Sequence, residues 1–151
     1  MKILITYGSQ TGNAEQISHT LFSIIEEENK EVEIYPMNYF SNNIEDINNY
    51  DYVIFLCSTT GNGEFPENAF QFWKNVKKRT LEKNTFESLK FSVCALGDTN
   101  YSMFCFSGKS LNKRLLQLGA TEIMPIFCMD AVEDDEEEFE KYVNQLLPML
   151  T

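Results

Sequence analysis

The stretch that most constrains this chain is a short polar segment near its N-terminus, residues 7–14, which reads Tyr-Gly-Ser-Gln-Thr-Gly-Asn-Ala. It follows an apolar run at residues 3–5 and precedes a segment in which apolar residues recur at helical spacing. A loop of small residues between a buried strand and a helix directs backbone N–H groups and the positive end of the helix dipole toward one point. The segment therefore predicts a loop that holds a phosphate group.

The spacing of the glycines excludes the two commonest phosphate loops. Gly8 and Gly12 lie four residues apart, with no Lys after the second glycine and no third glycine where a dinucleotide fingerprint requires one. Ser9, Thr11 and Asn13 donate hydrogen bonds without positive charge, which suits a phosphomonoester held by neutral groups. A plain strand-to-helix turn with Asn13 as N-cap is the alternative interpretation of these residues.

The length, composition and net charge of the chain predict one domain with an acidic surface. A chain of 151 residues, 43% of them hydrophobic, can bury a substantial core. No apolar run approaches the roughly 20 residues of a membrane span, and no signal-peptide pattern opens the chain, so we expect a cytoplasmic protein. The formal net charge of -11 disfavours nucleic acid and membranes as partners and favours a basic protein. Nothing in the sequence demands more than a monomer.

The cysteines and the histidine do not form a recognisable catalytic or metal site. Cys57, Cys94, Cys105 and Cys128 are scattered singly, without a C-x-x-C pair, so the sequence predicts neither a zinc site nor a dithiol motif. Cys57 and Cys94 lie within apolar runs and are expected to be core residues. His19, the single histidine, falls inside the first helical pattern and is expected at its surface.

Strand and helix patterns alternate along the whole chain. Strands are expected at residues 2–7, 32–35, 52–57, 91–96 and 122–127, and helical spacing or short turns occupy the connections. Residues 52–57 are continuously apolar, as in a central parallel strand, whereas residues 32–35 alternate and suit a position near the sheet edge. Right-handed crossovers then give a doubly wound α/β fold with helices on both faces and its ligand beyond the carboxyl ends of the strands.

Three polar loops follow strands and are expected to converge on one rim of this sheet. They are residues 7–14, 58–66 and 97–104. Their sequences resemble those of flavodoxins, and more closely the FMN domain of the diflavin reductases, the group that includes the sulfite reductase flavoprotein, methionine synthase reductase and the cytosolic iron-sulfur assembly reductase. The resemblance is carried by residues 8–15, 58–63, 95–101, 108–109 and 114–120. It implies one flavodoxin-like domain over residues 1–151, strand order 2-1-3-4-5, and FMN as cofactor.

The resemblance also implies which residues contact FMN: a phosphate loop, a loop beside the flavin N5 edge, and a loop beside the outer ring face. These residues are Ser9, Gln10, Thr11, Gly12, Asn13, Ala14, Ser58, Thr59, Thr60, Gly61, Asn62, Gly63, Leu96, Gly97, Asp98, Tyr101, Phe104, Cys105 and Asp130. Tyr101 matches the tyrosine that stacks on the flavin ring. Thr60 stands where many relatives have an aromatic residue, and Cys105 where they frequently have Asn.

The activity implied by the resemblance is one-electron transfer through semiquinone and hydroquinone states, from a flavoprotein reductase to a haem, cobalamin or iron-sulfur protein. The alternatives are the FMN domain of a diflavin NADPH reductase and a small flavin reductase that acts directly on quinone or nitro compounds. A phosphorelay receiver is disfavoured, because Gly8, Ser9 and Gln10 replace its acidic cluster. An acidic run over residues 130–140 is expected either to dock a basic partner or only to complement the dipole of the last helix.

Overall fold

The computed structural model describes residues 1–9, 12–60, 63–97, 105–130 and 135–150, with the side chain of Asp135 excepted. Its strands are β1 (Lys2–Gly8), β2 (Glu31–Pro36), β3 (Tyr52–Ser58), β4 (Lys90–Gly97), β5 (Thr121–Glu122) and β6 (Phe127–Asp130). Its α-helices are α1 (Asn13–Glu27), α2 (Glu67–Val76), α3 (Phe106–Gln117) and α4 (Asp135–Leu146). Short 3₁₀ helices occupy Met37–Phe40, Ile44–Asn49 and Leu147–Met149.

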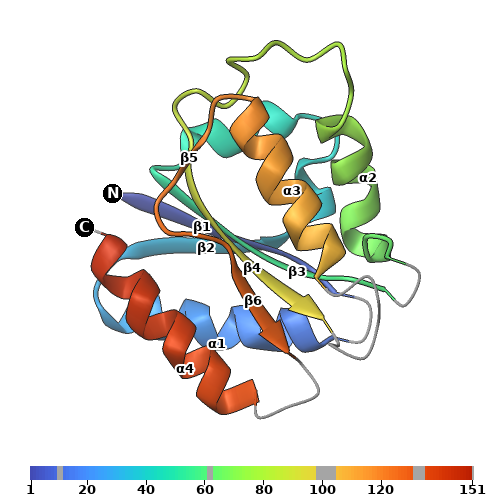
Figure 1. Ribbon diagram of the computed structural model, residues 1–151. Coiled ribbons are helices and arrows are strands. Elements are labelled where there is room, and N and C mark those ends of the chain that lie inside the picture. Colours follow the sequence, from blue (N-terminus) through green and yellow to red (C-terminus); the bar gives the residue numbers. More distant parts are fainter. Residues whose placement is uncertain (10–11, 61–62, 98–104, 131–134, 151) are drawn as a thin grey trace.

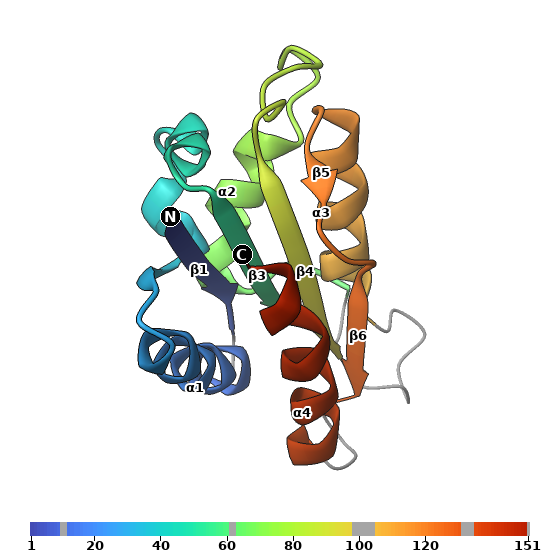
Figure 2. The same cartoon turned by 90° about the vertical axis from the view of Figure 1, so that its left-hand side faces the viewer.

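The strands form one parallel sheet in the order β2-β1-β3-β4-β5, and β6 also pairs with β4. Helices α2 and α3 cover one face, while α1 and α4 cover the other (Figure 1). The view in Figure 2 shows α1 and α4 side by side along their face of the sheet. The predicted doubly wound fold, its strand order and the edge position of the second strand are thus confirmed.

Alternating side chains of the central strands divide the core into two layers. Val53, Phe55 and Cys57 face α2 and α3, where Phe72 and Leu111 pack against the sheet. The intervening residues of the same strand join the other layer, which α1 and α4 cover with Leu21, Tyr142 and Leu146 among others. Both layers are mainly apolar, in keeping with the almost wholly apolar side chains of residues 52–57.

The prediction of a single fifth strand at residues 122–127 is wrong. Two short strands, β5 and β6, occupy this edge position, and β5 pairs with Lys90 and Phe91 whereas β6 begins only at Phe127. Between them, the Ile123 amide still donates to the Phe91 carbonyl at 2.8 Å. Pro125 has no N–H to continue the ladder, so the strand breaks there and resumes beyond it.

Short 3₁₀ helices precede β3 and follow α4. Ile44 and Ile47 anchor the 3₁₀ helix Ile44–Asn49 in the connection before β3, and their side chains are buried. The last α-helix ends at Leu146 and continues as a 3₁₀ turn through Pro148, which cannot donate within an α-helix. Within the described ranges, no helix combines the length and the apolar character that crossing a membrane requires.

Candidate functional site

The carboxyl ends of four strands meet at one edge of the sheet. Gly8 at the end of β1 is the register partner of Cys57, and Ser58 is that of Leu96. Gly97 at the end of β4 is paired with Asp130, the last residue of β6. Helices α1, α2 and α3 all begin at this edge, so the predicted phosphate loop and the segments after β3 and β4 share it (Figure 1).

The segment after β1 is held by two hydrogen bonds in which Ser9 takes part. Its backbone amide donates to Asn68 Oδ1 in α2 at 2.8 Å, and its hydroxyl oxygen accepts from the Gly12 amide at 2.9 Å. Gly12 has a φ of 90°, in the left-handed region that favours glycine. Asn68 is a site residue that sequence reasoning missed, because it precedes no recognisable motif and reaches Ser9 only across the fold.

Helix α1 begins without a side-chain cap. Its N-cap is Gly12, and no side chain of the described residues makes a capping hydrogen bond to the first amides, so Asn13 is the first helical residue and not the N-cap that the alternative interpretation required. The first amides of a helix have no partner within the helix. An anion beside Asn13 and Ala14 would accept from these amides and meet the positive end of the helix dipole.

A tyrosine of β1 is hydrogen-bonded to a glutamate in the first turn of α1. The Tyr7 hydroxyl donates to Glu15 Oε1 at 3.4 Å, and burial followed by the charge of Glu15 raises the pKa of Tyr7 above its ordinary value. Tyr7 therefore stays protonated at neutral pH and remains a hydrogen-bond donor. His19 on the same helix is exposed, as expected from the sequence, with its ring 6.1 Å from that of Tyr7.

The segment after β3 is tied to β4 and to α3. The Thr59 amide donates to the Leu96 carbonyl at 3.2 Å, and its hydroxyl oxygen accepts from the Ser107 amide in the first turn of α3 at 2.9 Å. Thr60 closes its own loop, since its hydroxyl oxygen accepts from the Glu64 amide at 3.1 Å. Thr59 thus caps the start of α3. Among the described residues, no side chain caps α1 in this way.

Replacing Thr59 with valine is expected to lower the free energy of unfolding by about 1 kcal/mol, because the Ser107 amide loses its capping partner. FMN binding should weaken as well, because the loop beside the site is no longer tied to α3. Urea unfolding and a fluorescence titration with FMN measure the two effects. Serine at position 59 keeps the hydroxyl and serves as the control. Equal losses in T59V and T59S would contradict a role for this bond.

Three of the predicted site residues have side chains directed into the protein. Ala14 and Cys105 are fully buried, and Leu96 is 1% exposed in the core layer beneath α1 and α4. The Cys105 thiol donates to the Ala95 carbonyl at 3.3 Å. These residues can reach a cofactor through their backbone only. Phe65 is likewise buried and stacks on Trp73 with 4.6 Å between ring centroids.

Several predicted site residues lie outside the described residues. They are Gln10, Thr11, Gly61, Asn62, Asp98, Tyr101 and Phe104. The described remainder lies at the carboxyl ends of the strands, in the loops that follow them, or at the starts of α1 and α3.

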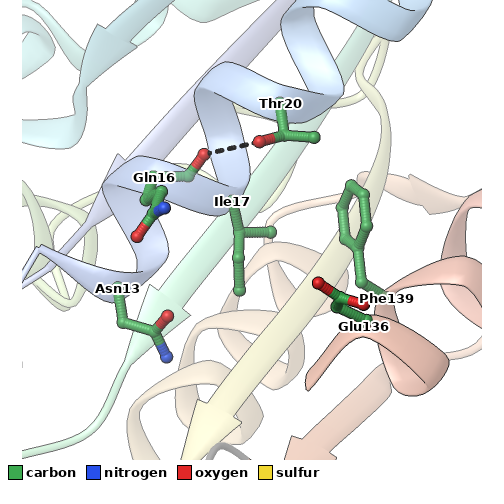
Figure 3. Close-up of a pocket in the computed structure, with 6 residues that line it drawn as sticks. All are labelled: Asn13, Gln16, Ile17, Thr20, Glu136 and Phe139. Carbon is green, nitrogen blue, oxygen red and sulfur yellow. Dashed lines mark hydrogen bonds between the residues drawn. The ribbon is translucent and has the colours of Figure 1, made fainter. Parts of the chain in front are cut away.

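A pocket of about 300 Å³ adjoins the phosphate loop from the side of α1 and α4. Figure 3 shows Ile17 and Phe139 in its wall, with Asn13 and Gln16 along α1 and Glu136 on α4. Of the predicted cofactor-binding residues that the structure describes, only Asn13 lines it. The pocket therefore lies beside the phosphate loop and is not the space between the three loops.

The comparison with known proteins agrees with this arrangement of loops around a parallel sheet. A sequence profile of the flavodoxin family matches residues 5–142. The chain belongs to the flavodoxin family. Oxidised flavodoxin 2 from Bacillus cereus superposes with a TM-score of 0.79 and 29% identity, over 95% of this chain and 94% of that one. A cysteine-to-alanine mutant of the flavodoxin from Pseudomonas aeruginosa gives a TM-score of 0.75 and 24% identity, over 97% of this chain and 99% of that one.

Longer relatives share the flavodoxin domain. NADPH-dependent diflavin oxidoreductase 1 of Bos taurus is 34% identical over 142 residues, which are 91% of this chain and 22% of the relative. The protein of the same name from Emericella nidulans is 36% identical over 122 residues, 81% of this chain and 18% of the relative. The chain thus spans about a fifth of the length of these curated relatives.

Flavodoxins bind FMN, and the described residues fit this cofactor. A phosphomonoester needs hydrogen-bond donors, and the uncapped start of α1 presents backbone amides behind the left-handed Gly12. The side-chain donors in residues 7–15 are neutral hydroxyl and amide groups, and this segment contains no Lys or Arg. The chain is accordingly a flavodoxin-like FMN-binding domain.

Proposed function

We propose that this domain carries electrons one at a time between a reductase and an acceptor protein, with FMN bound across the loops after β1, β3 and β4 and beside Asp130. The observation that carries the proposal is the uncapped N-terminus of α1 at the carboxyl edge of a flavodoxin sheet. When bound, FMN supplies a ring that accepts one or two electrons. The protein's part is to hold the cofactor and to control its surroundings.

Several residues have distinct parts in this proposal. Ser9 and Asn68 fix the loop after β1 so that the first amides of α1 face the phosphate. Thr59 holds the loop after β3 against α3, and Thr60 keeps that loop closed on Glu64. Tyr101 is proposed to stack on the ring, as its counterpart does in relatives.

Stepwise anaerobic reduction of the FMN-loaded protein tests the proposal. The protein is incubated with FMN, freed of excess cofactor by gel filtration, and titrated with reductant while the visible spectrum is recorded. We expect retained flavin and two resolved one-electron steps. A single two-electron step would contradict the carrier function. Steady oxidation of NADPH by the isolated chain would instead favour a flavin reductase that acts directly on small molecules.

The second candidate is the FMN domain of a diflavin NADPH reductase. It is favoured by the identity of 34% to NADPH-dependent diflavin oxidoreductase 1 over 91% of this chain. In that case the electron donor would be an NADPH-oxidising flavoprotein module. The two candidates are separated by comparing how fast such a module and a flavodoxin reductase, each at the same low concentration, reduce this domain. Faster reduction by the NADPH-oxidising module favours the diflavin reductase domain.

The partner is proposed to be basic and to dock at the carboxyl edge of the sheet. The net charge is -11, and the first turn of α4, which begins at this edge, carries the exposed residues Glu136 and Glu137. Clustered carboxylates attract a basic surface and raise the association rate, most strongly at low ionic strength. The domain is proposed to act as a monomer.

Reversing Glu136 and Glu137 to lysine is expected to slow electron transfer to a basic partner about tenfold at low salt and to reduce its salt dependence. The control reverses Glu26 and Glu27, which are exposed in the last turn of α1 at the opposite edge. Both double variants change the net charge equally. Stopped-flow rates at several ionic strengths measure the effect. Equal slowing in both variants would show that net charge alone matters and would exclude docking at α4.

A further inference from the structure

Two cysteines that are far apart in the sequence meet beneath the carboxyl edge of the sheet. Cys105 is the N-cap of α3, and Cys128 lies in β6 as the register partner of Ala95 in β4. Residues that are register partners in adjacent strands project to the same face of the sheet. Cys128 therefore lies beside Ala95 on one side of the sheet. The Cys105 thiol reaches the carbonyl of the same alanine at 3.3 Å.

The close approach of α3 to β4 brings the two thiols together. Gly108 packs so tightly on Ala95 that an added Cβ would lie 2.3 Å from the alanine Cβ. This glycine is one helical turn from Cys105 and therefore sets the distance between the start of α3 and the sheet. The Cys105 sulfur also lies within hydrogen-bonding reach of Cys128, so its single proton can be donated either to the Ala95 carbonyl or to the Cys128 sulfur.

The surroundings favour a thiolate on Cys128 and a thiol on Cys105. The hydrogen bond from Cys105 and the nearby Lys109 ammonium lower the pKa of Cys128 to about 7, against the opposing effect of partial burial. The same hydrogen bond and burial raise the pKa of Cys105. Cys128 is partly exposed and Cys105 fully buried. The reactive form is thus on the accessible residue, and its neighbour is positioned to resolve it.

We propose that Cys128 is a peroxide-reactive thiol and that Cys105 resolves its oxidised form into an intramolecular disulfide. The Cys128 thiolate attacks hydrogen peroxide, so that an S–O bond forms, the O–O bond breaks, and hydroxide leaves and is protonated to water. The Cys105 sulfur then attacks the sulfenic sulfur, the S–S bond forms, and the hydroxyl departs as water with the Cys105 proton. Two thiols lose two electrons in total, and one peroxide becomes two waters.

The test is thiol counting by mass spectrometry on the FMN-loaded protein, treated with hydrogen peroxide in the dark near neutral pH. After quenching in acid and alkylation, the wild type is expected to lose two of its four thiols, and proteolysis should yield one linked pair of peptides that contain Cys105 and Cys128. C128S is expected to lose thiols at least about tenfold more slowly, because an ordinary thiol is mostly protonated at this pH.

Two further variants separate this proposal from general oxidation. C105S should stop at the sulfenic acid, which a cyclic 1,3-diketone captures on Cys128, and K109Q should slow the first step because the Lys109 charge is lost. C57S is the matched control, since Cys57 is fully buried with its pKa raised to about 12, and it should behave as the wild type. Circular dichroism checks that each variant is folded.

Three results would overturn the proposal. They are thiols of the wild type that survive peroxide, a linkage that contains Cys94 or joins two chains, and a C128S variant that loses thiols as fast as the wild type. None of these outcomes depends on electron transfer by the domain, so the test is independent of the proposed function.

Discussion

Replacing Gly108 with valine is expected to lower the free energy of unfolding by about 3 kcal/mol, at the upper end of typical overpacking effects. The first side-chain carbon would lie 2.3 Å from Ala95 Cβ and 3.0 Å from Ala95 Cα. Carbon atoms in contact normally stand about 3.5–4.0 Å apart, so α3 would have to move away from the sheet by about 1 Å or more. The clash involves backbone and a short rigid side chain, and neither can turn aside.

The same displacement should weaken FMN binding. The Ser107 amide donates to Thr59 and the Cys105 thiol to the Ala95 carbonyl, and both donors lie at the N-terminal end of α3. Urea unfolding and FMN titration of G108V measure stability and affinity together. K113V is the control, because Lys113 is exposed on the same helix and its replacement introduces the same β-branched side chain without a clash. Equal losses of stability in the two variants would contradict the packing argument.

Replacing Gly12 with alanine is expected to weaken FMN binding about tenfold, which corresponds to about 1.4 kcal/mol. A Cβ at this position meets no atom of the described residues within 4 Å, so the effect is expected to come from the backbone. The φ of 90° costs an L-residue about 1–2 kcal/mol, and the loop can relieve this strain by rotating. Rotation would move the Gly12 amide away from the Ser9 hydroxyl and turn the first amides of α1 away from the phosphate.

Gly119 supplies the matched control for this variant. It also has a left-handed backbone, with a φ of 92°, but it follows α3 at the opposite edge of the sheet. G119A should therefore lose stability, since its Cβ would also press on the Lys83 carbonyl at 3.1 Å, while its FMN dissociation constant stays unchanged. FMN fluorescence quenching gives both Kd values. Tight FMN binding by G12A, or an equal loss of affinity in G119A, would show that the left-handed turn does not shape the cofactor site.

The fold could be predicted because its signals are local. Apolar runs such as residues 52–57 mark buried strands, and helical spacing marks what connects them, so the strand order and the edge that carries the loops follow from rules of chain connection. Ser9 and Thr59 could be assigned to that edge because each follows a strand directly. The split into β5 and β6 was not predicted, although Pro125 in the middle of the segment indicates it.

Local patterns in the chain were enough to predict the layers, the strand order and the edge at which the loops gather. The side chains that support that edge could be identified only from contacts between distant segments. Asn68 reaches Ser9 from 59 residues away, and Thr59 accepts from the Ser107 amide, 48 residues along the chain. Cys105 and Cys128, which are isolated thiols in the sequence, become partners because Gly108 lets α3 lie directly on Ala95. Periodicity records which face of an element is buried, but the contacts between elements depend on how closely their backbones approach, and no local pattern encodes that distance.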